Sequence, residues 1–412
     1  MNTQFDIIIL GGGIVGLTLA ACLKQSDLKI ALVEAKAFDL QQNYKNKEKD
    51  YDLRVSAINR ASEMVFRNTR IWQEIKAMRS SPYLHMKVWD QAGTGEIHFS
   101  HQAINQPNLG HIIENSVIQK ALLENLQAHK NFHYFAPNKA LALWHNDETI
   151  SLQLDDATEL KARLLVGADG ARSWLRDAAD FAVTQKGYGH EAIVCTIETQ
   201  LAHDKIARQW FLPHGVLAFL PLQDEHYCSV VWSYDAKKID SLLEMNDAIF
   251  KDELSKASQY KLGDIKFASK RMSFPLTMRH VKKYVKPRIA IIGDAAHTIH
   301  PLAGQGMNLG IMDAACLADV IIEAYNQQRD IGHLHTLRKY ERWRRGENAA
   351  MIVAMNSFKQ LFSQQTKPVI WMRSLGLKLT DKTMPLKNLF SKKALGVVGD
   401  LPQIATHEKN DE

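Results

Sequence analysis

The feature that most constrains this chain is an uncharged apolar run near its start, Ile7–Leu23. A run of 17 residues has the length of a short membrane helix or of the apolar part of a signal peptide. Three consecutive glycines, Gly11–Gly13, stand in its middle, and each weakens a helix by about 1 kcal/mol. Asp6 precedes the run and no Lys or Arg does, which argues against a signal peptide. The run therefore predicts a buried strand, a glycine turn and a buried helix.

Composition excludes several classes of protein. Apolar residues make up 46% of the chain, charged residues 23%, and the net charge is only +6. This balance excludes a disordered chain, a collagen and a highly basic tail, so no nucleic-acid partner is expected. The four cysteines are isolated, which excludes a zinc ribbon and a CxxC redox pair. No metal site is expected, and the expected compartment is a reducing cytoplasm.

Apolar segments of the kind found in parallel sheets occur in three separated places: Phe5–Leu10, Arg163–Val166 and Arg288–Ile292. Between the last two, the stretch 190–272 is typical of an antiparallel sheet. After Asn308 the chain is mostly helical in pattern. The expected fold is therefore α/β, with an interrupted Rossmann-like nucleotide-binding domain, an inserted β-rich domain and a helical C-terminal region. The expected boundaries are residues 1–83, 108–182 and 280–348 for the first, 84–107 and 183–279 for the second, and 349–412 for the third.

The glycines of the apolar run form a nucleotide-binding pattern, with Gly11, Gly13 and Gly16 between the expected strand and helix. They permit a tight turn and close approach of a pyrophosphate to the helix N-terminus, which carries free N–H groups and partial positive charge. Glu34 ends the next strand, where an acid can accept hydrogen bonds from ribose hydroxyls. Together these features predict dinucleotide binding. The alternative is a glycine-rich turn beside a surface glutamate.

A second constellation begins at Gly293-Asp294, where a buried strand delivers a carboxylate to its C-terminal end. A glycine-rich loop follows, and a helix is expected to begin near Asn308. Asp294 can bind ribityl hydroxyls, and the helix N-terminus can stabilise negative charge on a reduced flavin ring. This constellation therefore favours FAD over NAD as the resident nucleotide.

A third motif, Gly167–Arg176, contains Asp169-Gly170, which alone would be a simple turn. The three motifs in this order resemble the class A FAD-dependent aromatic hydroxylases. Along nearly the whole chain the sequence is similar to the ubiquinone-biosynthesis hydroxylases, and most to their 2-polyprenylphenol (2-octaprenylphenol) hydroxylase branch. The stretches that carry this resemblance are Leu53–Ser62, Leu109–Gln119, Ala207–Gln209, Ala218–Leu222, His300–Gly310, Arg338–Arg342 and Gly376–Leu379.

The resemblance implies an NAD(P)H- and FAD-dependent monooxygenase that uses O2 through a flavin C4a-hydroperoxide. The implied reaction is hydroxylation of the ring of a polyprenylated phenol in aerobic ubiquinone biosynthesis. Two alternatives stay open: hydroxylation of the later methoxy-methyl-benzoquinol, and a non-catalytic FAD-binding role in the biosynthetic complex. A flavin-dependent halogenase would be expected to carry Trp-x-Trp, which this chain lacks.

The resemblance also assigns residues to the FAD site, although Arg54 could be a surface arginine and Gln119 could form a helix-opening capping box with Ser116. The implied set is Gly11, Gly13, Gly16, Glu34, Arg54, Gln119, Asp169, Gly170, Gly293, Asp294, Pro301, Gly304, Gly306, Met307 and Asn308. The sequence identifies no catalytic residue. His297 and His300 are candidates for a proton shuttle, and the alternative is that they fix the flavin loop.

Two further groups bear on the substrate. Phe219, Pro221 and Trp232 are candidates for lining the substrate site over the flavin, or else plain core. Residues 367–393 hold seven Lys or Arg against one Asp, mixed with apolar residues. That mixture suits peripheral contact with an anionic membrane such as the inner membrane, and the alternative is a solvated basic face. The expected partners are thus the polyprenylated phenol, the membrane surface and a ubiquinone-biosynthesis complex.

Overall fold

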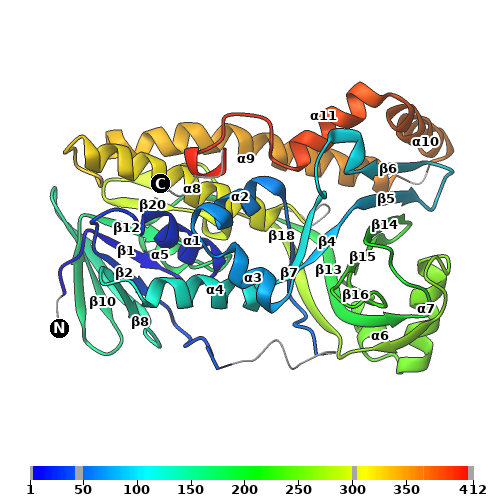
Figure 1. The fold of residues 1–412 in the computed structure, drawn as a ribbon, viewed down its shortest axis with the longest axis horizontal. Coiled ribbons are helices and arrows are strands. Elements are labelled where there is room, and N and C mark those ends of the chain that lie inside the picture. The colour runs from blue at the N-terminus through cyan, green and yellow to red at the C-terminus, as the bar shows by residue number, and fades with distance from the viewer. Residues whose placement is uncertain (1–2, 42–49, 299–303, 365, 407–412) are drawn as a thin grey trace.

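The computed structural model describes residues 3–41, 50–298, 304–364 and 366–406. Its elements form an elongated molecule with a large sheet at each end, and two long helices, α8 (Gly306–Asn326) and α9 (Leu334–Ser363), run along one side (Figure 1). The mixed α/β fold with a β-rich part and a helical C-terminal region, which the sequence predicts, is confirmed.

One sheet has six strands in the order β19-β20-β12-β1-β2-β8. All neighbours are parallel except β19 and β20. The bounds are β1 Ile7–Leu10, β2 Ile30–Val33, β8 Phe132–Phe135, β12 Leu164–Gly167, β19 Val285–Lys286 and β20 Ile289–Ile291. The sheet thus gathers segments far apart in the sequence, including the three apolar segments.

The apolar run near the start of the chain forms the centre of this sheet's core. It folds into β1, which is buried on both faces, and α1 (Ile14–Leu23), which packs against α8 and against α4 (Asn115–Gln127). Among the described residues, no helix is long and apolar enough to cross a membrane. The run is therefore the strand, turn and helix that its glycines predict.

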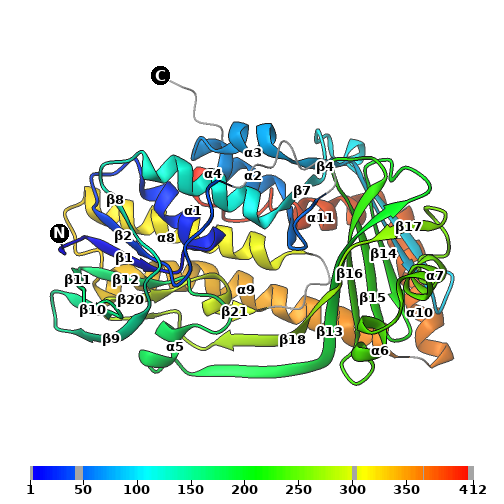
Figure 2. The ribbon, with the colours of Figure 1, turned by 90° about the horizontal axis from the view of Figure 1, so that it is seen from below.

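The second sheet has the strand order β21-β18-β13-β16-β15-β14-β5-β6, with β17 pairing to β13. It is antiparallel apart from the β14–β5 pair. The bounds are β5 His85–Asp90, β6 Glu96–Ser100, β13 Val183–Thr199, β14 Ile206–Leu212, β15 Gly215–Pro221, β16 Tyr227–Asp235, β17 Ile265–Ala268, β18 Met272–Val281 and β21 His297–Thr298. The long strands β13 and β18 extend from this sheet toward the six-stranded one (Figure 2).

Smaller elements complete the chain. The three-stranded sheets are β3 Val55–Ile58, β7 Gly110–Glu114 and β4 Ser81–Tyr83, and β9 Ala140–His145, β10 Ile150–Leu154 and β11 Glu159–Ala162. The other helices are α2 Arg60–Asn68, α3 Trp72–Met78, α5 Trp174–Ala178, α6 Ile239–Leu243, α7 Asp247–Ala257, α10 Lys367–Lys382 and α11 Met384–Ala394. Short 3-10 turns span Gln102–Ile104, Gly293–Ala295 and Gln403–Ala405. Residue 349, the expected start of the C-terminal region, lies inside α9, which continues past it.

Candidate active site

The parallel strands β2, β1, β12 and β20 of the six-stranded sheet end at the same edge of the sheet. Leu10, Val33, Gly167 and Ile291 are register partners in one row across β2, β1, β12 and β20. The residues that follow them are the glycine turn, Glu34, the Asp169-Gly170 pair and the Gly293-Asp294 pair. Ligands of open α/β sheets bind at the carboxyl ends of the strands. The fold therefore brings all three sequence motifs to one edge.

The three glycines of the first motif meet different constraints. Gly11 has φ +114°, and a Cβ on it would lie 2.4 Å from the Ala168 carbonyl oxygen. A Cβ on Gly16 would lie 2.1 Å from the Gly11 carbonyl oxygen, so these two glycines are required by packing. A Cβ on Gly13 would meet nothing within 4 Å. Open space at the start of α1 is what close approach of a diphosphate needs.

The middle glycine, Gly12, is held from both sides. Its N–H donates to Glu34 Oε2 at 2.6 Å, and its carbonyl accepts from Gln119 Nε2 at 2.7 Å. Both predicted cofactor contacts therefore also fix the turn. The predicted capping box is wrong: α4 begins at Asn115 and has no side-chain cap bond, because Gln119 is bonded to the turn instead.

Asp169 lies beside the glycine turn, and one of its two carboxylate oxygens is hydrogen-bonded. Its Oδ2 accepts from the Leu175 N–H at 3.0 Å, while its buried Oδ1 has no partner within the described parts of the chain. Burial raises the pKa of Asp169, and hydrogen bonds from Ser173 and Leu175 act against that rise. Gly170 has φ +78°, and a Cβ there would meet nothing within 4 Å. An unsatisfied acceptor beside open backbone suits the hydroxyl-rich part of a dinucleotide.

Asp294 follows β20 and faces a cationic environment. Its side chain is exposed, yet the protein atoms around it reduce its hydration and raise its pKa. The charges of His297 and Arg54 act in the opposite direction, so the structure brings the predicted Arg54 close to Asp294. Gly293 has φ +60°, and a Cβ on it would lie 3.1 Å from Val15 of α1. The second motif therefore packs directly on the helix of the first.

The start of α8 is fastened to β3 by one buried amide. Asn308 Nδ2 donates to the Ala57 carbonyl at 2.8 Å and to the Gly304 carbonyl at 3.3 Å, and its Oδ1 accepts from the Asn59 N–H at 3.0 Å. The side chain of Asn308 therefore positions α8 from within the protein. Gly304 has φ +61°, Gly306 is the first residue of α8, and Met307 is half-buried.

His297 belongs to a buried polar network rather than to a free proton path. Its Nε2 bonds to Asp313 Oδ2, and Asp313 Oδ1 accepts from Arg344 Nε at 2.8 Å and from Asn348 Nδ2 at 3.1 Å. Burial would raise the pKa of Asp313, but the charges of His297 and Arg344 hold it far below its usual range. His297 therefore ties β21 to α8 and, through Asp313, to α9. The other predicted histidine, His300, lies outside the described residues, as does Pro301.

Sequence reasoning missed Asp313 and Arg344, which hold this network together. A signal was present: Asp313 stands inside the apolar stretch Leu309–Leu317 of α8, and a charge in a buried helix face needs a partner. The partner, on α9, could not be read from the sequence because it lies 31 residues further along.

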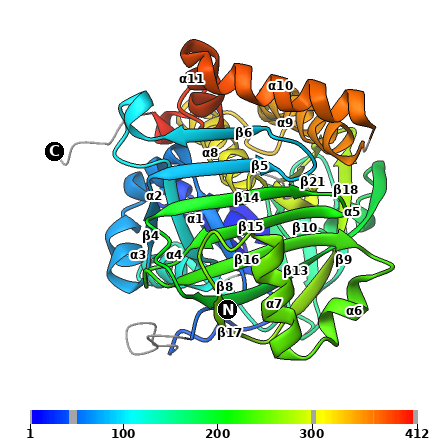
Figure 3. The ribbon, with the colours of Figure 1, turned by 90° about the vertical axis from the view of Figure 1, so that its right-hand side faces the viewer.

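The candidates for lining the substrate site lie on the face of the second sheet that α6 and α7 cover. Phe219 and Trp232 are buried in a core cluster beneath α6 and α7, and Pro221 alternates onto the same face. Figure 3 shows α6 and α7 over this face, with the six-stranded sheet behind. This placement favours the alternative that they are plain core, because strand alternation decides which face a residue occupies. The opposite face carries Ala218 and Leu220.

The residues present fit FAD. Open backbone at Gly13 and Gly170 and the unpaired Asp169 Oδ1 face the same sheet edge as Glu34 and Asp294.

Residues 4–353 also match the protein family described as FAD binding domain. The chain is 34% identical over 396 residues to the 3-demethoxyubiquinol 3-hydroxylase of Escherichia coli (strain K12), covering 96% of this chain and 100% of that protein. It is 33% identical to the ubiquinone biosynthesis monooxygenase COQ6, mitochondrial, of Xenopus tropicalis, covering 93% of this chain and 91% of that one.

Solved structures share the fold. The probable FAD-dependent monooxygenase pqsL from Pseudomonas aeruginosa has a TM-score of 0.75 at 20% identity, covering 91% of this chain and 99% of that chain. The p-nitrophenol 4-monooxygenase PnpA from Pseudomonas putida DLL-E4 has a TM-score of 0.77 at 14% identity, covering 95% and 98%. Together with the family match and the relatives above 30% identity, the assembled motifs show that this chain belongs to the FAD-dependent aromatic hydroxylases.

Proposed function

We propose that this enzyme adds a hydroxyl group from O2 to the aromatic ring of a polyprenylated precursor of ubiquinone, with NAD(P)H as reductant. The observation that carries the proposal is the meeting of three FAD motifs at one sheet edge, in a chain that aligns over almost its full length with proteins named for ubiquinone hydroxylation.

The residues at this edge have distinct roles toward FAD. When bound, FAD accepts hydride from the nicotinamide and activates O2 for transfer to the ring. The glycine turn and the start of α1 would hold its diphosphate and Glu34 its ribose, while Asp169 and Asp294 offer further acceptors. The start of α8, held in place by Asn308, presents the positive end of a helix dipole to negative charge on the reduced ring.

We propose that the face of the second sheet bearing Ala218 and Leu220 covers the substrate. Leu220 packs in a cluster with Ala57 of β3. A Cβ on Gly304, in the flavin loop, would lie 3.3 Å from the Ala57 Cβ, so this face borders the flavin side. Its apolar character suits the exclusion of water from an oxygen-transfer reaction. The base that takes the phenol proton stays unassigned.

Two substrates of this class are favoured by different observations. The relative from Escherichia coli is named for hydroxylation of 3-demethoxyubiquinol, a late intermediate. The resemblance of the whole sequence, which is greatest to the 2-polyprenylphenol hydroxylases, favours the earlier polyprenylphenol. Both carry an electron-rich ring and a prenyl tail, so the same FAD chemistry serves either.

The decisive experiment measures oxygen incorporation with both substrates. The purified holoenzyme is given NADH or NADPH and ¹⁸O2, with either a short-chain 2-prenylphenol or a short-chain demethoxyubiquinol, and the products are analysed by mass spectrometry. We expect ¹⁸O in one product at a rate at least about tenfold above the other, which names the substrate. Cofactor oxidation without ¹⁸O in either product would contradict the hydroxylase, and a lack of cofactor oxidation with both substrates would favour the non-catalytic FAD-binding role.

We further propose that the enzyme works in the cytoplasm at the inner-membrane surface, docked through α10 and α11. Ten of the nineteen exposed large apolar side chains within the described residues lie between Val353 and Val398. We define the apolar C-terminal surface as Trp371, Met372, Leu375, Leu379, Leu389 and Phe390, with exposures from 40% to 66%. Exposed lysines accompany it at positions 367, 378, 382, 392 and 393. Apolar anchors with lysines suit an anionic bilayer.

The inner face of α10 is bound to the second sheet. Arg373, which the sequence counts among the membrane-facing cations, is buried and donates to both oxygens of buried Asp90 at 2.7 and 3.0 Å. A Cβ on Gly95 of the β5–β6 turn would lie 2.9 Å from the Ser374 Cα. The helix is therefore docked firmly, with its apolar stripe turned outward.

Vesicle flotation tests this contact. The variant W371S/L375S should bind vesicles of phosphatidylcholine with phosphatidylglycerol at least about tenfold more weakly, because two exposed apolar side chains that would enter the bilayer are lost. The matched control L141S/W144S removes the same residue types from another exposed site on β9. Equal binding by both variants would contradict the proposal.

A ubiquinone-biosynthesis complex as a further partner stays a prediction, which co-purification from cells would test.

A further inference from the structure

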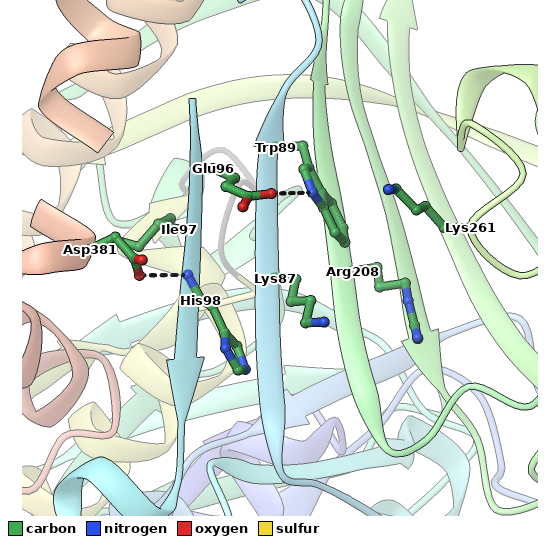
Figure 4. Close-up of a pocket in the computed structure, with 8 residues that line it drawn as sticks. All are labelled: Lys87, Trp89, Glu96, Ile97, His98, Arg208, Lys261 and Asp381. Carbon is green, nitrogen blue, oxygen red and sulfur yellow. Dashed lines mark hydrogen bonds between the residues drawn. The ribbon is translucent and has the colours of Figure 1, made fainter. Parts of the chain in front are cut away.

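A polar pocket of about 340 Å³ opens on the outer face of the second sheet, away from the FAD edge (Figure 4). Its floor is Trp89 of β5, which stacks on Trp210 at 5.2 Å between ring centroids. The pocket is bordered by β14 and β6, by Lys261, and by Asp381 of α10. The hydroxylase proposal uses none of these groups.

Three cations line this pocket without a carboxylate partner. Lys87 and Arg208 are direct register partners on β5 and β14, and like charges in that position repel. Arg208 is only 7% exposed, and its Nη1 donates to the carbonyls of His203 and Ile206 at 2.7 and 3.1 Å. No ion pair found among the described residues involves these two cations or Lys261. An anion bound between a buried cation and a second cation would offset their repulsion.

The carboxylates at the pocket are already bonded to other groups. Glu96 Oε2 accepts from the Trp89 indole N–H at 3.1 Å. Asp381 Oδ1 accepts from the His98 backbone N–H at 3.1 Å and from Lys387 Nζ at 3.0 Å. Glu96 keeps its negative charge, because the indole N–H is a neutral donor, whereas the charge of Asp381 is paired with Lys387. The three cations therefore still outnumber the one unpaired carboxylate among the described residues of the pocket.

The pKa of the histidine at this site, His98, is lowered in part by nearby positive charge. His98 is the register partner of Lys87 on β6. Burial, followed by the charges of His85 and Lys87, lowers the pKa of His98. Lys261 Nζ lies 5.7 Å from the centroid of the Trp89 ring and points toward it in Figure 4. Lys87 and Arg208 lie beside each other farther along their strands.

We propose that this pocket binds a phosphate group, with Lys87, Arg208 and Lys261 as its charged contacts. A phosphate offers several acceptor oxygens and negative charge in a volume that the pocket can hold. It can come from a phospholipid headgroup or from a soluble phosphate. The position of the pocket against α10, which carries the apolar C-terminal surface, favours the headgroup.

The test measures binding to two probes without any turnover, so its result is independent of the hydroxylase proposal. Inorganic phosphate is titrated calorimetrically into the holoenzyme, and vesicles of phosphatidylcholine with phosphatidylglycerol are tested by flotation with and without added phosphate. The variant is K87Q/K261Q. The control K237Q/K238Q removes two exposed lysines at the start of α6 and changes the net charge equally.

We expect K87Q/K261Q to weaken binding of at least one probe about fivefold or more, with the control within about twofold of the unaltered protein. Loss of vesicle binding alone identifies the lipid headgroup, and loss of calorimetric phosphate binding identifies a soluble phosphate. Equal behaviour of both variants toward both probes, at unchanged melting temperature, would overturn the proposal. Failure of the unaltered protein to bind either probe would overturn it as well.

Discussion

In the glycine turn, Gly11 and Gly13 are required for different physical reasons. Gly11 is required by the protein itself, since its φ is +114° and its Cβ would collide with the Ala168 carbonyl. Gly13 has φ −73° and open space, so its lack of a side chain serves something outside the chain. The motif therefore combines one structural and one ligand-facing requirement.

These two glycines give a paired prediction. G11A should lower the free energy of unfolding by about 3 kcal/mol or more, because the added Cβ has no room. G13A should change the melting temperature by less than about 2 °C yet weaken FAD binding at least about tenfold, since its methyl group occupies the space for the diphosphate. Denaturant unfolding and flavin fluorescence measure the two effects. Equal FAD affinity in G13A and the unaltered protein would contradict this account.

Glu63 supplies a pH prediction. It is 1% exposed and lies 2.9 Å from Arg67 and 3.3 Å from His111. Burial raises its pKa, but His111 and Arg60 lower it further, to about 2. A depressed carboxyl pKa stabilises the fold above the unfolded value of 4.5, and this contribution is lost as pH falls toward 2.

The stabilisation at neutral pH should be of the order of 3 kcal/mol. The free energy of unfolding of the unaltered protein should therefore exceed that of E63Q by a constant amount above about pH 5, and the difference should shrink below it. Urea unfolding between pH 3.5 and 7 measures this. A difference that stays constant down to pH 3.5 would show that the ionised carboxylate is not the source.

At the scale of elements, the Asp313 network joins three parts that the chain presents separately. Asp313 lies on α8, Arg344 on α9 and His297 in the loop after β20, and the Gly293 N–H donates to Asp313 Oδ2 at 3.1 Å. One carboxylate thus ties Gly293 and His297 to both long helices.

Replacing the carboxylate of Asp313 should destabilise the folded protein. D313N should lower the free energy of unfolding by about 3–5 kcal/mol, because Arg344 is 2% exposed and would keep a buried charge without its main partner. FAD affinity should fall as well, since the loop of His297 loses its anchor. The control is E347Q, which removes the other acidic partner of Arg344, a side chain that is 42% exposed. Similar losses in both variants would contradict the special role of Asp313.

At the scale of the whole molecule, the FAD edge is built from segments around residues 11, 34, 119, 169 and 294, which only the folded chain brings together. FAD should therefore bind the native state and not the unfolded chain. The proposed substrate cover on the second sheet and the apolar C-terminal surface on α10 and α11 lie on other parts of the same molecule.

Native-state binding predicts a concentration-dependent gain in stability. Free FAD at about 100 times its dissociation constant should raise the free energy of unfolding of the apoprotein by about 2.7 kcal/mol. Thermal unfolding at several FAD concentrations measures the gain, with G13A as the control that folds but binds poorly. A melting temperature that does not change with FAD would contradict assembly of the site in the native state.

Much of the fold and of the FAD site could be predicted from the sequence. The glycine turn, the buried strands and the order of motifs depend on backbone freedom and on short spacings, which the local sequence controls. For Phe219 and Trp232 the sequence left both a lining role and plain core open, because the face of a strand depends on register rather than on hydrophobicity. The boundaries of the domains stay a prediction.

The amino-acid sequence by itself predicted that the apolar run is a strand, turn and helix, because three consecutive glycines weaken a continuous helix and favour a turn. Only the tertiary structure decided that Gln119 bonds to Gly12 instead of capping its helix, and that Arg373 is buried against Asp90 rather than facing a membrane. Only the fold could pair Asp313 with Arg344. Those partners lie far apart along the chain, and their choice depends on which elements pack together, which no local pattern encodes.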